Sequence, residues 1–317
     1  MAKKIIGIDL GGTTVKLAVL TVEGTIERQW SIITDTSEGG INIIGDIVAT
    51  LKEHLHKFQI DLKDIVGIGM GSPGQVDCKE GTVTGAYNLG WWCKQHVRSI
   101  FEDAFGLPFY LDNDANVAAM GERWKGAGAE ADDIIFVTLG TGVGGGIIVD
   151  GKLVHGATAC AGEIGHIVVD PGGFQCTCGN RGCLETVASA TGIMNLTKVE
   201  LSRSQAESQL KILANNGKID AKDVFDLAKS GDVLAQAIVD RFAFYLGLAC
   251  GQLANTLNPR YIIIGGGVSK AGEFLKNKVE EQFSNFVLPT VKDRTELRLA
   301  SLGNEAGVIG AAGLVIL

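Results

Sequence analysis

The chain has few prolines, no recognisable secretion signal and no long membrane-spanning run. Only 5 of its 317 residues are proline, against 44 glycines, and 46% of the residues are hydrophobic. This composition is typical of a globular chain with many tight turns and excludes a disordered one. The opening stretch MAKKIIGIDLGG meets an aspartate and glycines after three apolar positions, so we expect no signal peptide. The length favours two domains over one.

Membrane and nucleic-acid partners are not expected either. The longest uncharged run, from Phe242 to Pro259, contains four polar residues: Gln252, Asn255, Thr256 and Asn258. It is typical of a buried helix in a soluble protein and not of a membrane span. The net charge of −8 argues against nucleic acid as the main partner. We therefore expect a cytoplasmic protein.

The cysteines are few and unevenly spaced. Seven is an odd number, and in a reducing cytosol disulfides are not expected. Cys176, Cys178 and Cys183 nevertheless fall within eight residues, with His166 upstream. One imidazole and three thiolates suit a tetrahedral structural Zn²⁺. The C-x-C pair is tighter than usual zinc spacing, so four residues without a metal remain the alternative, whereas the C-x-x-C of a redox dithiol is absent.

A strand–turn–strand unit occurs twice. IIGIDLGGTTVKLAVL is an apolar run to Asp9, a turn at Gly11 and Gly12, and a second apolar run to Leu20. IIFVTLGTGVGGGIIV, from Ile134, repeats this order of features. The repetition suggests one unit in each domain, although glycine-rich hairpins also recur by chance.

Helical and extended patterns alternate elsewhere in the chain. The helices are expected over 41–58, 114–126 after an Asp cap, 221–232, 235–257 and 304–317, and the strands over 65–71, 108–114 and 261–265. The last of these helices has small residues and should pack closely. This alternation predicts an α/β fold with mainly parallel central strands.

The glycine turns are candidate phosphate sites. GTGVGG at 140–145 matches the dinucleotide fingerprint in form, but a strand and a turn follow it where the fingerprint needs a helix. No P-loop motif is present. Turns whose glycines let backbone N–H groups approach an anion could instead hold a polyphosphate, with Asp9 holding Mg²⁺ through its water shell. The run Gly265–Gly267, expected to begin a helix, could border a nucleoside, and a plain hairpin is the alternative for each single turn.

DLGGTTVK, LGTGVGGG and GGGVS resemble the phosphate and adenosine motifs of the actin, Hsp70 and sugar-kinase superfamily. GEIGHI with CTCGNRGCLE resembles the ROK family of bacterial sugar kinases and sugar-responsive repressors, and within it the glucokinases of Gram-positive bacteria. The resemblance covers nearly the whole chain. It implies a two-domain, actin-like ATPase (ribonuclease H-like) fold with a cleft between the domains, ATP and Mg²⁺ as cofactors, a hexose substrate and a homodimer.

The same resemblance sets expected domain ranges and nucleotide contacts. A small N-terminal domain would span 1–117 plus about 303–317, and a large domain would span 118–302 and carry the zinc-binding segment 166–183. The expected nucleotide-binding residues are Asp9, Gly11, Gly12, Thr13, Thr14, Lys16, Gly140, Thr141, Gly142, Gly265, Gly266 and Gly267.

The stretch PFYLDNDAN ends a strand and begins a helix, at the kind of sheet edge where open α/β folds bind ligands. Phosphoryl transfer to a sugar hydroxyl needs positioning and a carboxylate that accepts the hydroxyl proton. The resemblance implies that Asn113 holds the sugar and that Asp114 contacts it as the general base. A helix N-cap is the alternative role for Asp114, and Asp112 is its local competitor.

Further sugar contacts are implied for Asn88, Glu163, His166 and Glu185, because carboxylates and amides read buried hydroxyls well. Exposed surface acids are the alternative for the two glutamates. A catalytic zinc keeps one coordination position open, and four protein ligands leave none. We therefore expect the zinc to be structural and to hold the backbone that carries both glutamates.

These inferences predict an ATP-dependent kinase that converts glucose to glucose 6-phosphate. Kinases for N-acetylmannosamine, fructose and other hexoses share the motifs and remain alternatives. A sugar-responsive repressor is an alternative of another class, but it would carry a helix-turn-helix ahead of the first phosphate loop, where only eight residues precede Asp9. Asp114 and the metal segment argue against a non-catalytic, actin-like assembly protein.

Overall fold

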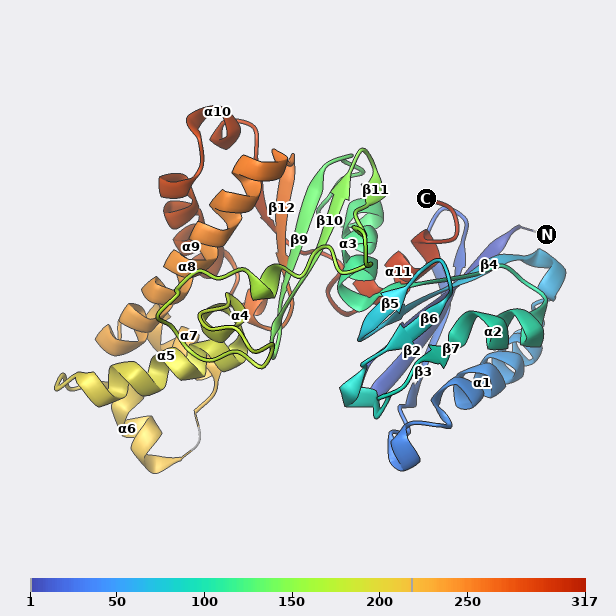
Figure 1. Ribbon diagram of the computed structural model, residues 1–317, viewed down its shortest axis with the longest axis horizontal. Helices are drawn as coiled ribbons and strands as arrows, with labels where there is room; N and C mark the ends of the chain where they lie inside the picture. Colours follow the sequence, from blue (N-terminus) through green and yellow to red (C-terminus); the bar gives the residue numbers. More distant parts are fainter. Residues whose placement is uncertain (1, 218) are drawn as a thin grey trace. The chain divides into compact units, whose positions relative to one another are not determined.

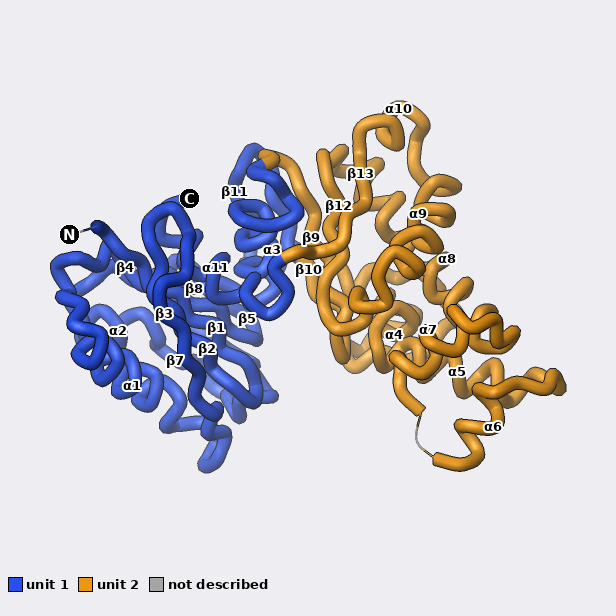
Figure 2. The backbone as a smooth tube through the Cα atoms, turned by 180° about the vertical axis from the view of Figure 1, so that it is seen from behind, with its two compact units in different colours: residues 1–130, 146–162, 302–317 blue, residues 131–145, 163–301 orange. Residues whose placement is uncertain are grey.

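The computed structural model describes residues 2–217 and 219–317, which form two compact units (Figure 2). The first unit holds residues up to 130, 146–162 and 302–317, and the second holds 131–145 and 163–301. Residues 118–130 and 146–162 thus belong to the first unit. The predicted ranges, 1–117 with 303–317 and 118–302, stay a prediction, and they include residues 1 and 218, which lie outside the described part.

A five-stranded sheet with the order β3-β2-β1-β4-β8 is the centre of the first unit (Figure 1). β1 pairs antiparallel with β2 and parallel with β4, which pairs parallel with β8. A small sheet has the order β5-β6-β7. The strands of these two sheets are β1 Lys4–Leu10, β2 Thr14–Thr21, β3 Ile26–Ile33, β4 Ile65–Ser72, β5 Gln75–Asp77, β6 Thr82–Thr84, β7 Gln95–His96 and β8 Phe109–Asn113. The helices are α1 Ile43–Lys57, α2 Val97–Phe105, α3 Asp114–Lys125 and α11 Ala306–Gly313, with 3₁₀ turns η1 Ser37–Gly39, η2 Leu62–Asp64, η3 Tyr87–Leu89 and η6 Gly303–Glu305.

The two faces of this sheet have separate cores because alternate strand residues point to opposite sides. Ile6 lies in the core shared with α1 and α2, and Ile5 lies in the one shared with α11. α11 approaches the sheet closely where β1 and β4 pair Gly7 with Gly69. A Cβ at Gly69 would lie 1.8 Å from the carbonyl oxygen of Ala311, so only glycine fits there. The predicted close packing of the last helix is confirmed.

The second sheet has the order β11-β10-β9-β12-β13. β12 pairs parallel with both β9 and β13, whereas β10 and β11 are antiparallel. Both sheets are therefore mixed, and the predicted parallel arrangement holds for β1-β4-β8 and β9-β12-β13. The bounds are β9 Ile134–Leu139, β10 Val143–Val149, β11 Lys152–Leu153, β12 Tyr261–Gly265, β13 Glu296–Leu299, α4 Glu185–Ala188, α5 Ala190–Arg203, α6 Gln209–Asn216, α7 Ala221–Lys229, α8 Val233–Leu257, α9 Glu273–Phe286, α10 Pro289–Lys292, η4 Ile164–His166 and η5 Val268–Ala271.

Within the described residues, one helix, α8, is long and apolar enough to cross a membrane by length and composition alone. Of its most apolar window, 56% is buried inside the protein, and the helix packs against α5, α7 and α9. Its N-cap, Asp232, accepts hydrogen bonds from the N–H groups of Leu234 and Ala235 at 3.1 and 3.0 Å. These contacts are those of a core helix, as predicted for 242–259.

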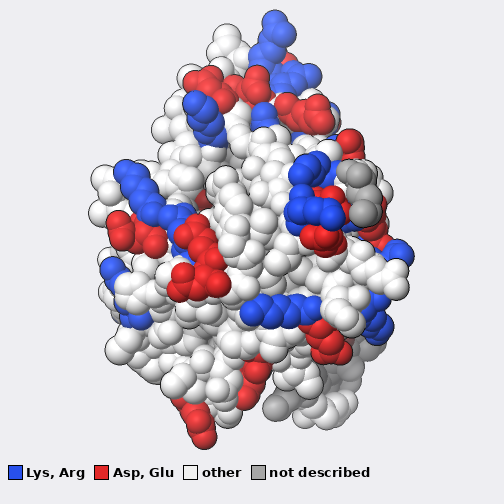
Figure 3. All heavy atoms as spheres, turned by 90° about the vertical axis from the view of Figure 1, so that its right-hand side faces the viewer, with Lys and Arg blue, Asp and Glu red and all other residues white. Residues whose placement is uncertain are grey.

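Acidic and basic side chains are interspersed on the face drawn in Figure 3. In the first unit, ion pairs join opposite charges, as between Lys63 and Asp61 at 2.8 Å and between Lys4 and Glu27. Exposed pairs of this kind contribute only about 0–1 kcal/mol each. Exposed charged pairs therefore bear on solubility more than on the stability of the fold.

Candidate functional site

The first glycine turn joins β1 to β2 and contains Gly11, Gly12 and Thr13. The N–H of Gly11 donates to the carbonyl of Thr14 at 3.1 Å, and the hydroxyl of Thr34 donates to the carbonyl of Gly11 at 2.7 Å. Gly12 faces the exposed Asn88, since a Cβ there would lie 3.0 Å from Asn88 Nδ2. The structure thus holds this turn by hydrogen bonds and brings Asn88 to it.

Asp9 is the second-last residue of β1, next to this turn. Its Oδ2 lies 3.6 Å from Nζ of Lys16, which also donates to the carbonyl of Asn304 at 3.2 Å. A Cβ at Gly307, in the first turn of α11, would lie 2.4 Å from Asp9 Cγ, so that glycine makes room for the carboxyl group. Burial raises the pKa of Asp9, and the Lys16 ammonium group opposes this shift. A carboxylate next to a cation and a glycine turn is suited to bind a divalent metal ion that is itself bound to phosphate groups.

The strand register places the predicted sugar-side residues at the same sheet edge. Gly71 of β4 pairs with Asp9 on one side and with Asp112 on the other. Asn113 is the N-cap of α3, because its Oδ1 accepts the N–H of Ala115 at 2.9 Å. The predicted Asp cap was wrong by one residue. Asp114 is instead the first residue of α3, where its carboxyl group is exposed.

Asp112 is only 3% exposed and is engaged inside the unit. Its Oδ1 accepts the N–H of Asn113 at 2.7 Å and Nδ2 of Asn116 at 2.9 Å, and its Oδ2 lies 2.6 Å from Nε2 of His155. The hydrogen bond to Asp112 raises the pKa of His155, against the effect of burial. Asp112 is therefore buried among internal partners, whereas Asp114 is exposed, with its Oδ1 accepting the N–H of Ala115 at 2.8 Å.

The second glycine turn joins β9 to β10. The N–H of Gly140 donates to the carbonyl of Gly142, and the N–H of Ala190 donates to the carbonyl of Gly140, both at 2.9 Å. The hydroxyl of Thr191 donates to the carbonyl of Thr141 at 2.8 Å. The first turn of α5 thus anchors the loop.

The third glycine run differs from its prediction. Gly265 is the last residue of β12, and Gly266 has φ +84 with its Cβ position 2.5 Å from the carbonyl oxygen of Leu139. Gly267 does not begin an α-helix: the 3₁₀ turn η5 follows it, and α9 begins only at Glu273. Gly272, at φ 75, separates the two because a left-handed residue cannot continue a helix.

The four predicted zinc ligands lie together in the second unit. Four ligand atoms, one from each of the side chains His166, Cys176, Cys178 and Cys183, lie within 4.8 Å of one another. Nδ1 of His166 is 3.7 Å from Sγ of Cys176, and the Sγ atoms of Cys178 and Cys183 are 3.6 Å apart. Tetrahedral Zn²⁺ with bonds of about 2.0–2.3 Å separates its ligands by about 3.3–3.8 Å. The donor set and spacing therefore fit the ion.

The predicted sugar-binding acids lie next to these ligands. Oε2 of the exposed Glu163 is 3.9 Å from Nε2 of His166, and the thiol of Cys176 donates to Oε1 of Glu185 at 3.4 Å. Glu185 also reaches the second glycine turn, because a Cβ at Gly142 would lie 2.4 Å from its Oε2. A cavity of about 270 Å³ opens here, lined by Gly142, Cys176 and Glu185 among others.

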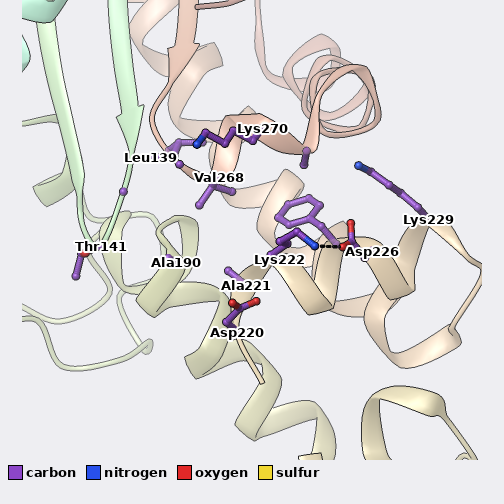
Figure 4. A pocket seen from close by; sticks show the side chains of 14 residues that line it. Leu139, Thr141, Ala190, Asp220, Ala221, Lys222, Asp226, Lys229, Val268 and Lys270 are labelled. Carbon is purple, nitrogen blue, oxygen red and sulfur yellow. Dashed lines mark hydrogen bonds and ion pairs between the residues drawn. The ribbon is translucent and has the colours of Figure 1, made fainter. Parts of the chain in front are cut away.

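A larger cavity of about 440 Å³ lies in the same unit (Figure 4). Its lining comes from the second glycine turn, from α7 and from η5. Phe225 and Val268 give it apolar walls, and Lys270 and Lys229 bring ammonium groups to it, while Lys222 pairs with Asp226 at 2.7 Å. Apolar walls with a few cationic groups suit a flat heterocycle that carries phosphates.

A sequence model of the ROK family matches residues 5–317. The chain belongs to the ROK family. A glucokinase of Halalkalibacterium halodurans is 46% identical over 98% of this chain and 94% of its own. A xylose repressor of Caldicellulosiruptor bescii is 32% identical over 98% of this chain and 78% of the repressor.

A solved ROK family glucokinase from Streptomyces griseus, in complex with glucose and AMPPNP, is similar with a TM-score of 0.76. It is 34% identical to this chain, and the match covers 98% of each. The expected ROK resemblance and the α/β, two-domain, actin-like fold class are thereby confirmed.

Two parts of this ROK chain escaped the sequence analysis. The sequence predicts α7 as a helix, and the Asp220–Asp223 capping box and apolar face of α7 agree with this prediction. No sequence motif, however, indicates that α7 lines the larger cavity next to a glycine turn. The bond between Asp112 and His155 joins residues 43 positions apart. Neither residue stands in a spacing pattern that signals such a pair.

Proposed function

We propose that this chain is an ATP-dependent hexose kinase that phosphorylates glucose to glucose 6-phosphate. The observation that carries the proposal is an exposed carboxylate, Asp114, at the sheet edge where β1 also carries Asp9 and leads into a glycine turn, in a chain 46% identical to a glucokinase. ATP supplies the phosphoryl group. The glycine turns, with Thr13, Thr14, Lys16 and Thr141, hold its phosphates, Asp9 holds Mg²⁺, and the cavity between α7 and η5 takes the adenosine.

Asp114 is the proposed general base that accepts the proton of the attacking sugar hydroxyl. Its exposure and the engagement of Asp112 in internal hydrogen bonds support this choice. Asn113 and Asn88 orient the sugar from the same edge, although Oδ1 of Asn113 also caps α3.

Glu163, His166 and Glu185 are the proposed sugar contacts of the second unit. A structural Zn²⁺ held by His166, Cys176, Cys178 and Cys183 would hold the backbone of this segment, because both glutamates lie next to its ligands. The zinc itself has no open position and takes no part in the transfer. We further propose that the protein is cytoplasmic and forms a homodimer. Light scattering on the purified protein tests the dimer.

The decisive test is Asp114→Asn. The variant should bind glucose as the wild type does, while kcat falls by about 10²–10⁴-fold, because only proton acceptance is lost. Asp103→Asn, an exposed carboxylate on α2, is the matched control and should keep normal turnover. Near-normal turnover of Asp114→Asn would contradict the assignment.

A sugar-responsive regulator is the second candidate, and the match to the xylose repressor favours it. ADP release measured over glucose, N-acetylmannosamine, fructose and allose separates the candidates. Turnover with another hexose in preference to glucose corrects the substrate, and sugar binding without any turnover supports the regulator.

A further inference from the structure

A second cluster of metal-binding side chains lies in the first unit, at the sheet edge that also carries Asn113 and Asp114. Cys78 follows β5, Asp112 lies in β8 and His155 follows β11, and one donor atom from each lies within 4.8 Å of the others. The proposed kinase reaction uses none of the three. Nitrogen, oxygen and sulfur donors from three separate segments therefore converge without an assigned role.

Asp112 is held as a metal-ligating carboxylate usually is. Its Oδ1 accepts hydrogen bonds from the N–H of Asn113 and from Asn116, so its orientation is set by partners on the far side. Its Oδ2 is the atom that faces His155, at 2.6 Å from Nε2. Outer hydrogen bonds of this kind orient ligands and strengthen metal binding.

Cys78 is also held in place. The guanidinium group of Arg98 donates to the carbonyl of Cys78 at 2.6 Å and to the carbonyl of Lys79, also at 2.6 Å. The side chain is partly buried against the core of this unit. The backbone that presents the sulfur is thus anchored, while His155, with a side chain 36% exposed, can adjust.

We propose that Cys78, Asp112 and His155 form a second metal site, for Zn²⁺ or another divalent cation that prefers sulfur and nitrogen ligands. One thiolate and one carboxylate balance the charge of the ion, and three protein ligands leave a fourth position for water. The ion needs Nε2 and Oδ2 about 3.3 Å apart, since its bonds to them are about 2.0–2.1 Å. A shift of His155 by under about 1 Å supplies this separation.

Co²⁺ added to the full-length protein that carries one Zn²⁺ per chain, held by the four-ligand site, tests the second site independently of the kinase proposal. Zn²⁺ binds such ligands more tightly than Co²⁺, so the four-ligand site keeps its zinc. The wild type should take up one Co²⁺ per chain, counted by elemental analysis after desalting, with a thiolate-to-cobalt absorption band. Cys78→Ser should abolish the band and weaken Co²⁺ binding by about tenfold or more.

Cys160→Ser is the matched control, because Cys160 is exposed in the same unit and lies outside the cluster. It should leave the band and the affinity unchanged. His155→Gln should weaken binding as Cys78→Ser does, and it serves as the second variant if the serine variant fails to fold. Absence of Co²⁺ uptake by the wild type, or an unchanged band in Cys78→Ser, overturns the proposal and leaves Asp112 and His155 as a hydrogen-bonded pair.

Discussion

Gly142→Ala should damage sugar binding without damaging the fold. A Cβ at this position would lie 2.4 Å from Oε2 of Glu185. Carbon and oxygen in ordinary contact lie about 3.3–3.6 Å apart, so the carboxylate must retreat by about 1 Å. The atom that moves is the end of a flexible side chain, so the cost in stability is small. The proposed hydrogen bond from Glu185 to a sugar hydroxyl is lost.

The size of the loss follows from that one hydrogen bond. A hydrogen bond to a charged group contributes about 1.5–3 kcal/mol. Each 1.4 kcal/mol is tenfold in affinity, so glucose should bind about 10- to 10²-fold more weakly to Gly142→Ala. Titration calorimetry with glucose and no nucleotide measures this directly, and it avoids any contact between the new methyl group and phosphates.

Gly140→Ala is the control, from the same turn. The nearest atom to its Cβ position is the carbonyl oxygen of Gly142 at 4.0 Å, so nothing is displaced. Its glucose affinity should match that of the wild type. Wild-type affinity in Gly142→Ala, or an equal loss in both variants, would refute a sugar contact by Glu185.

Three further predictions concern stability and metal content. Removal of zinc, or Cys183→Ala, should lower glucose affinity and melting temperature together, and full activity in demonstrably zinc-free protein would refute the role of the metal. Gly69→Ala forces a methyl group against the carbonyl of Ala311 and should lower the free energy of unfolding, measured in urea, by about 1–3 kcal/mol or more. Gly45→Ala, in α1 with open space around it, should raise this free energy by about 0.5–1 kcal/mol. Equal effects of the two substitutions would contradict the packing argument. Asp232→Ala should cost about 0.5–2 kcal/mol at pH 7. Burial acts to raise the pKa of Asp232, but its hydrogen bonds hold this pKa below the ordinary value of 3.8. The stability that the Asp232 carboxylate contributes is therefore present above pH 3.8 and is lost as pH falls through the lower pKa of the folded state. A difference in unfolding free energy between Asp232→Ala and wild type that persists in acid would refute this cap.

The sequence predicts best where local pattern and local structure coincide. The run to Asp9, the glycine turn and the return strand form β1 and β2 as expected, because apolar alternation and glycine act over a few residues. The four zinc ligands lie within one segment of 18 residues, 166–183, and the structure brings them together. Because their members are close along the chain, such clusters can be predicted from the sequence.

Prediction fails where the deciding contact is distant or where neighbours compete. Asp114 and Asn113 are both good N-cap residues, and the β8 geometry that selects Asn113 is set by pairing with β4. The helix expected after Gly267 begins later because Gly272 adopts a left-handed conformation. The contribution of α7 to the larger cavity depends on tertiary packing, which no local pattern records.

The first unit is completed by a helix from late in the chain, which affects folding during synthesis. The first unit contains residues 302–317, and a Cβ at Gly7 of β1 would lie 2.0 Å from the carbonyl oxygen of Val308 in α11. This face of the first sheet therefore lacks the cover of α11 on the ribosome until residues 306–313 have been made. The apolar groups of that face, Ile5 and Leu20 among them, are exposed during this interval. Nascent chains stalled before residue 306 should accordingly recruit chaperones more strongly than chains that include α11 do.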